Sequence, residues 1–160
     1  MKTAYAKSGN KYAAVFLNWK NFAKQPYVSA THGERFVLNY ANDAASAYGK
    51  YEQAGKMPAG AVAAKNSFTV SAKGQVAVGP LFLMEKMRKG FSTASGDWRY
   101  TLIMPDGTVI GDGAVDALLA GAVLDSLGDV GSGHETAQAL RALAAAIDPR
   151  HIDGQAFALT

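Results

Sequence analysis

The sequence predicts an α+β fold in which helices pack on an antiparallel β-sheet and a C-terminal helical hairpin follows. Between residues 32 and 110, segments rich in β-branched and aromatic residues alternate with turn signals, the strongest at 72–75 and 105–107. Beyond residue 112 the spacing of apolar residues changes from 2 to 3.6. We therefore divide the 160 residues into a body, 1–112, and an alanine-rich helical tail, 113–160, that packs on the body or extends it.

The N-terminal third of the body predicts two helices with a strand between them. Residues 11–24 carry large apolar side chains at helical spacing, which predicts a helix ending before Pro26. Residues 32–40 are typical of a turn that leads into a strand. Asn42 and Asp43 are preferred N-cap residues, so we expect a second helix over 44–54, ended by Gly55.

The rest of the body predicts four strands joined by tight turns. A buried strand over 60–70 leads through a hairpin turn into a return strand over 76–87, bent at Gly79-Pro80. A third strand over 97–104 places Trp98, Tyr100, Leu102 and Met104 on one face, and a partner strand begins at 108–110.

The tail predicts a helical hairpin. Its first helix begins after Asp112, a plausible N-cap, and carries one apolar stripe up to Leu127. The sequence Ser132-Gly133-His134-Glu135 has the Ser-x-x-Glu pattern of a capping box, so a second helix is expected from there to Pro149.

Composition limits the function classes. The chain has no cysteine, which excludes disulfides, thiol catalysis and thioether attachment of haem. No apolar run approaches the ~18 residues of a membrane span, and no signal peptide is recognisable at Met1. Up to residue 112 there are 14 basic and 7 acidic residues, and after it 2 and 6. The basic residues are scattered, which speaks against a nucleic-acid surface.

One lysine, Lys65, stands in the middle of the apolar run 60–70. An ammonium group is costly to bury unless it is paired, neutralised or used in chemistry. Lys65 therefore either reaches water from a sheet edge or points into a pocket. Arg35, Tyr40, Trp98 and Tyr100 are the other candidates for lining that pocket, although aromatic residues on strands more often pack the core.

The remaining motifs are weaker. Gly111-Asp112-Gly113 lacks the further glycine and the Gly-Lys-Ser/Thr of a phosphate loop. His32 with Glu34, and His134 with Glu135, each offer only two metal ligands, whereas metal sites normally gather three or four. Histidines in polar loops are the simpler interpretation.

A series of short motifs between residues 15 and 111 resembles the cytochrome P460 domain family. The motifs occur in the following order: Trp19-Lys20-Asn21-Phe22, Pro26-Tyr27-Val28-Ser29, Thr31-His32-Gly33-Glu34-Arg35-Phe36-Val37, Asn39-Tyr40-Ala41-Asn42, Met57-Pro58-Ala59-Gly60, Lys65, Gly79-Pro80-Leu81, Met84-Glu85-Lys86-Met87, Gly96-Asp97-Trp98-Arg99-Tyr100 and Pro105-Asp106-Gly107.

The resemblance implies a P460-type antiparallel sheet, a homodimer, a periplasmic location and a c-type haem that handles hydroxylamine or nitric oxide. Lys65 occupies the position of the lysine that is cross-linked to haem in members that oxidise hydroxylamine. The family attaches its haem through Cys-x-x-Cys-His. Here Val130-Gly131-Ser132-Gly133-His134 keeps the histidine and lacks both cysteines, so covalent c-type haem is excluded.

Two functions follow as hypotheses. In the first, the chain is a P460-like domain without covalent haem, a module that binds a small ligand near Lys65 or interacts with a second protein. In the second, it holds haem without a covalent bond and acts on small nitrogen oxides or oxygen species. His134 would then be the iron ligand, Lys65 and Arg35 the catalytic residues, and Trp98 and Tyr100 would contact the haem.

Overall fold

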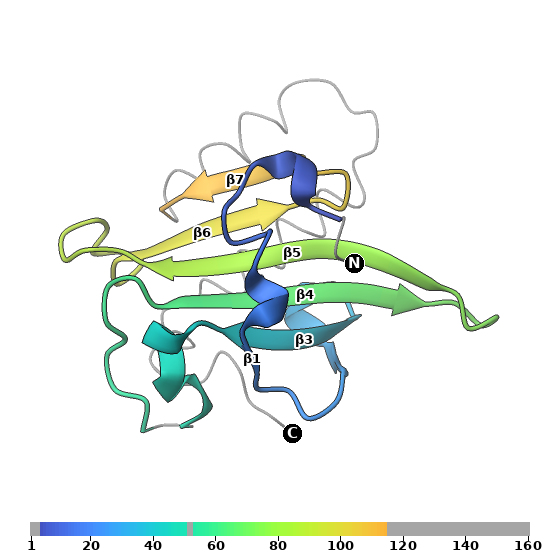
Figure 1. Cartoon of the computed structure of the whole chain (residues 1–160), viewed down its shortest axis with the longest axis horizontal. Helices are drawn as coiled ribbons and strands as arrows, with labels where there is room; N and C mark the ends of the chain where they lie inside the picture. Colours follow the sequence, from blue (N-terminus) through green and yellow to red (C-terminus); the bar gives the residue numbers. More distant parts are fainter. Residues whose placement is uncertain (1–3, 51–52, 115–160) are drawn as a thin grey trace.

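The computed structural model describes residues 4–50 and 53–114, and these form a mainly β structure around one antiparallel sheet of seven strands (Figure 1). The strand order is β1-β3-β4-β5-β6-β7, and β2 pairs separately with β3. The strands are β1 (Lys20–Asn21), β2 (Tyr27–Ser29), β3 (Arg35–Ala41), β4 (Val62–Val70), β5 (Val76–Lys86), β6 (Trp98–Ile103) and β7 (Val109–Gly113). The predicted antiparallel sheet is confirmed. The predicted tail hairpin and His134 lie outside the described residues.

The described helices are four short 3₁₀ segments: η1 (Ala6–Ser8), η2 (Phe16–Asn18), η3 (Ala30–His32) and η4 (Asp43–Gly49). None of them is long and apolar enough to cross a membrane. The α+β prediction therefore overstates the helix content of the described part of the chain.

The helix predicted over 11–24 is wrong. Only η2 forms there, and β1 follows it directly. The Asn10 and Asn21 side chains accept hydrogen bonds from the backbone N–H groups of Tyr12 and Ala23, both at 2.9 Å. Such local bonds compete with helical ones. The large side chains of this segment instead pack on the sheet from an irregular backbone.

The second predicted helix is shorter and tighter than expected. Asn42 caps η4 as predicted, because its Oδ1 accepts from the Ala45 N–H at 3.1 Å. The segment ends at Gly49 rather than before Gly55, and Ala45 has a non-helical backbone conformation.

Strand positions and turns agree well with the sequence. The β6–β7 turn at 105–107 is confirmed, with Gly107 at φ +94° and the Met104 N–H bonded to the Thr108 carbonyl at 2.8 Å.

Asp112, however, lies in β7 rather than at a helix start. There it accepts two hydrogen bonds from Arg99, at 2.7 and 2.5 Å, and one from Thr101. Its carboxylate completes an ion pair across β6 and β7 and is not an N-cap.

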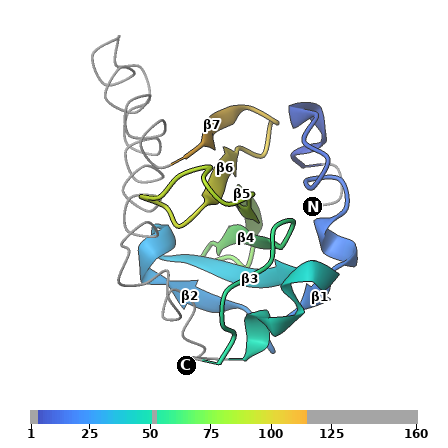
Figure 2. The ribbon, with the colours of Figure 1, turned by 90° about the vertical axis from the view of Figure 1, so that its left-hand side faces the viewer.

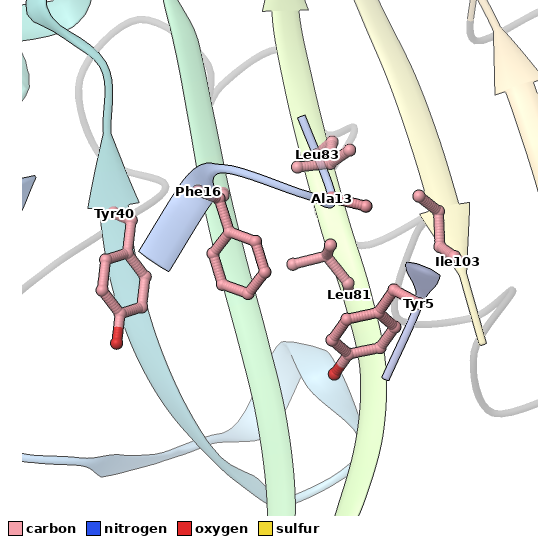
Figure 3. Packing of buried hydrophobic residues seen from close by; sticks show 8 residues of the cluster. Tyr5, Ala13, Phe16, Tyr40, Leu81, Leu83 and Ile103 are labelled. Atoms are coloured by element: carbon pink, nitrogen blue, oxygen red, sulfur yellow. The ribbon is translucent and has the colours of Figure 1, made fainter. Parts of the chain in front are cut away.

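The main apolar core lies between the sheet and the N-terminal segment 4–19, which crosses one face of it (Figures 1 and 2). We call this the core face. Tyr5, Ala13 and Phe16 from the segment meet Tyr40, Ala64, Leu81, Leu83 and Ile103 of four neighbouring strands (Figure 3). The Tyr5 hydroxyl also donates to the Gly79 carbonyl at 2.7 Å. With this face closed, the residues that alternate with it, including Lys65, lie on the opposite face.

Candidate functional site

Lys65 lies near the centre of the sheet, on the face opposite the N-terminal segment. On β4 it pairs in register with Asn39 of β3 and Phe82 of β5, and Phe82 pairs in turn with Leu102 of β6. Directly opposed residues share a face, so these four side chains form one row. We call the surface that carries this row the Lys65 face.

Lys65 does not reach water from an edge strand, because β4 is central and the residue is only 4% exposed. Burial removes water from the ammonium and lowers the pKa of Lys65 to about 7. Burial thus favours the neutral amine over the ammonium form. The interpretation that Lys65 reaches water from a sheet edge is therefore wrong.

His32 approaches this row from η3. Its ring packs edge-on against Phe82 with a centroid distance of 4.5 Å, and its Nδ1 is 2.8 Å from the Ser29 hydroxyl. It is 5% exposed, so the interpretation as a polar loop histidine is wrong. Burial, followed by the nearby charge of Lys65, lowers the pKa of His32 to about 2. The imidazole is thus neutral at physiological pH.

The chain reverses direction at Gly33 and Glu34, directly after η3, and the contact of His32 with Phe82 places its ring on the Lys65 face. Gly33 and Glu34 both have left-handed backbone conformations, with φ of +68° and +55°. Only glycine adopts this region without strain. The sequence signal for this turn, Gly33 next to a strand start, was visible, but nothing in it indicated where the histidine would point.

Two polar atoms on the Lys65 face have no hydrogen-bond partner within residues 4–50 and 53–114. The Asn39 side chain, 1% exposed, donates through Nδ2 to the Tyr27 hydroxyl at 2.9 Å, whereas its Oδ1 is unsatisfied. The Tyr100 hydroxyl on β6 is also buried and unsatisfied, and burial raises the pKa of Tyr100 to about 12. An unsatisfied buried polar atom costs ~1–3 kcal/mol and calls for an explanation.

Two more of the predicted site residues lie on the same face but farther out. Arg35 and Trp98 share it by strand alternation, Arg35 at the start of β3 and Trp98 at the start of β6. The Trp98 ring lies under the Lys86 ammonium at 5.2 Å. Tyr40, the remaining pocket candidate, packs in the core on the opposite face.

Arg35 packs close to Gly79, whose lack of a side chain leaves room for it. A Cβ on Gly79 would stand 3.1 Å from an Arg35 guanidinium nitrogen and 2.5 Å from the Ser67 hydroxyl oxygen. Ser67 donates to the Pro80 carbonyl at 2.7 Å beside the irregular pairing of β4 and β5. Gly79 therefore lets Arg35 and Ser67 approach the strand on the Lys65 face.

Covalent c-type haem is excluded because the chain has no cysteine, and His134, the candidate ligand for haem held without a covalent bond, lies outside the described residues. Among residues 4–50 and 53–114 no group of three His, Cys, Asp or Glu side chains could hold a metal ion.

No family model matches the chain, and a comparison with curated proteins finds no similar sequence. The chemistry of the site therefore rests on its own geometry. A buried amine with a lowered pKa can act as a nucleophile or as a base. The amide oxygen of Asn39 accepts a hydrogen bond, and the hydroxyl of Tyr100 either donates or accepts one.

Proposed function

We propose that this chain is a P460-like domain without covalent haem, and that it binds a small ligand on the Lys65 face. The observation that carries the proposal is the combination of a buried lysine with two unsatisfied polar atoms, Asn39 Oδ1 and Tyr100 OH, on one face of the sheet. Perturbed titratable groups and orphaned polar atoms gather at functional sites, where a ligand satisfies them.

The P460 assignment draws on the ordered motifs and on the antiparallel sheet that the resemblance implies. It also draws on Lys65, which stands where the family has its haem-linked lysine. A homodimer and a periplasmic location belong to the same proposal. Light scattering of the purified chain at two concentrations tests the dimer, and a monomer at both would remove it.

The ligand that suits this face is small and mostly apolar, with one hydrogen-bond donor. Phe82 and Leu102 continue the row from Lys65, and Ile110 of β7 packs against them. Together they form an apolar strip beside the amine. The donor would bond to Asn39 Oδ1, which stands across the strand pair from Lys65.

Benzyl alcohol is a suitable probe, because it combines one aromatic ring with one hydroxyl donor. We expect saturable chemical-shift changes in amides of β3, β4 and β5 around Asn39, Lys65 and Phe82. Asn39→Leu, which removes the acceptor, should weaken binding about tenfold. Lys73→Met, in the exposed β4–β5 turn, is the matched control and should leave binding unchanged. Shifts that do not saturate, or that centre on the core face, would refute the proposal.

Addition of haemin tests the alternative, a haem protein that acts on hydroxylamine, nitric oxide or related ligands. We expect a spectrum without a sharp Soret band and no saturable binding, because the chain lacks the two cysteines through which the family holds its haem. A sharp Soret band that His134→Ala abolishes would establish the alternative instead. Loss of that band in Lys65→Met would place the haem on the Lys65 face.

A further inference from the structure

The sheet is covered on both of its faces at its centre. Residues 62–67 of β4 are all buried, and successive side chains of a strand point to opposite faces. The N-terminal segment 4–19 covers the core face. A sheet face is buried only when another element packs on it, so the Lys65 face has a covering layer of its own.

Two short segments of the described chain pack on the Lys65 face, near β3. His32 of η3 contacts Phe82, and η4 packs against β3 and β4. Figure 2 shows both segments beside β3, with β6 and β7 at the opposite side of the sheet. On β6, however, Tyr100 and Leu102 are only 1% and 0% exposed. These two large side chains therefore need a further cover.

That cover belongs to the chain itself, because these exposed fractions are those of a single chain. Residues 1–3, 51–52 and 115–160 lie outside the described ranges. The first two stretches are too short to cover a tyrosine and a leucine. Residues 115–160, which follow β7, are the part of the chain that is long enough.

The place where the described chain ends fits this role. β7 is the neighbour of β6, and Gly113 stands directly across from Tyr100. The sequence that follows carries apolar side chains at helical spacing, which we call the apolar stripe: Val115, Leu118, Leu119, Ala122, Val123 and Leu127. After residue 112 the chain has 2 basic and 6 acidic residues, against 14 and 7 before it, so the two parts attract each other.

We propose that residues 115–160 pack over the part of the Lys65 face that carries Tyr100 and Leu102, with the apolar stripe against these two side chains. This layer would also give the Tyr100 hydroxyl a hydrogen-bond partner, which it does not have within residues 4–50 and 53–114. The inference does not depend on the proposed small ligand. It adds that a ligand bonded to Asn39 Oδ1 lies between the sheet and residues 115–160.

Contacts between leucine methyl groups test the proposal in the intact chain. Methyl-labelled leucines give NOE cross-peaks when they lie close together, and single leucine-to-methionine variants assign the peaks. Leu83 of β5 is the matched control, because it stands next to β6 but on the core face. We expect cross-peaks from Leu118 or Leu119 to Leu102 and none to Leu83. Cross-peaks to Leu83 alone, or none to Leu102, would overturn the proposal.

A pair of substitutions gives a second readout. Leu119→Asp would bury a carboxylate against the sheet, so we expect its urea midpoint to fall by about 1 M. Ala117→Asp adds the same charge outside the apolar stripe and should leave the midpoint unchanged. Equal midpoints for the two variants would overturn the assignment of the stripe.

The results also separate this inference from ligand binding. Saturable shifts with benzyl alcohol, without the methyl contacts, would remove residues 115–160 from the Lys65 face and leave the ligand-binding proposal standing. Methyl contacts without benzyl alcohol binding would support this inference and overturn the ligand.

Discussion

Replacing Lys65 by methionine removes a buried titratable group while keeping a similar side-chain volume. The pKa of Lys65 is lowered from 10.5 to about 7, so the unfolded chain holds this proton more tightly than the folded one. Between those two values stability rises with pH, since the unfolded state binds more protons. Below pH 7 the full penalty is present, on the order of 5 kcal/mol.

The measurement compares the two proteins across pH. The free energy of unfolding of Lys65→Met minus that of the natural chain should decrease by about 2 kcal/mol from pH 7 to pH 9. Contacts of Lys65 that do not depend on pH cancel in this difference. Urea denaturation at pH 6, 7, 8 and 9 gives the values, with Lys73→Met as the control whose difference stays flat. A difference in unfolding free energy between Lys65→Met and the natural chain that stays constant over this range would refute the description of Lys65 as a desolvated amine.

Three further substitutions test other parts of the structure. The folded pKa of His32, about 2, lies below its unfolded value of 6.5, so its contribution to stability is lost as pH falls from 6.5. The unfolding free energy of the natural chain minus that of His32→Gln should therefore drop by up to ~1.4 kcal/mol per pH unit between pH 6 and 4. A difference that stays flat in urea titrations would contradict this. Gly79→Ala should destabilise the protein by ~1–3 kcal/mol in urea denaturation, because its Cβ meets the Ser67 oxygen at 2.5 Å, and the double variant with Ser67→Ala should recover part of the loss. Asp112→Asn should cost less than about 1 kcal/mol by the same assay, because the ion pair with Arg99 is more than a third exposed, and a larger loss would indicate a role beyond that pair.

The strands and turns could be predicted because their signals are local. Alternation along 97–104 assigned Trp98 and Tyr100 to one face, and the register of β6 with β5 agrees. Glycine in a left-handed conformation ends both hairpin turns, at Gly74 and Gly107. Each of these signals depends on only a few neighbouring residues.

The helix over 11–24 could not be judged from its own residues. Its apolar spacing is helical, but the same side chains pack equally well on a wide sheet from irregular backbone. The pairing of Lys20 and Asn21 with β3 decides against the helix, and that partner lies about 20 residues away. The apolar spacing indicates that these side chains pack in a core, but it does not distinguish a helix from an irregular backbone that packs on a sheet.

Part of the candidate site could be predicted from the sequence. Lys65 stood out because a charge in an apolar run is unusual, whereas His32 and Asn39 looked like ordinary polar residues. Their roles come from contacts across the fold: His32 with Phe82, and Asn39 with Tyr27 and Lys65. These depend on sheet register and on the turn at Gly33, which a single sequence does not specify.

The buried Tyr5 has a consequence for how the chain folds as it is made. Its hydroxyl bonds to the carbonyl of Gly79, 74 residues later, and its N–H bonds to the carbonyl of Pro105. These two partners of Tyr5 therefore leave the ribosome only after most of the sheet has been synthesised, whereas Tyr40, which packs against Phe16, is made much earlier. Until β5 and the β6–β7 turn are made, Tyr5 lacks both of these hydrogen-bond acceptors, and the segment that carries it exposes apolar surface.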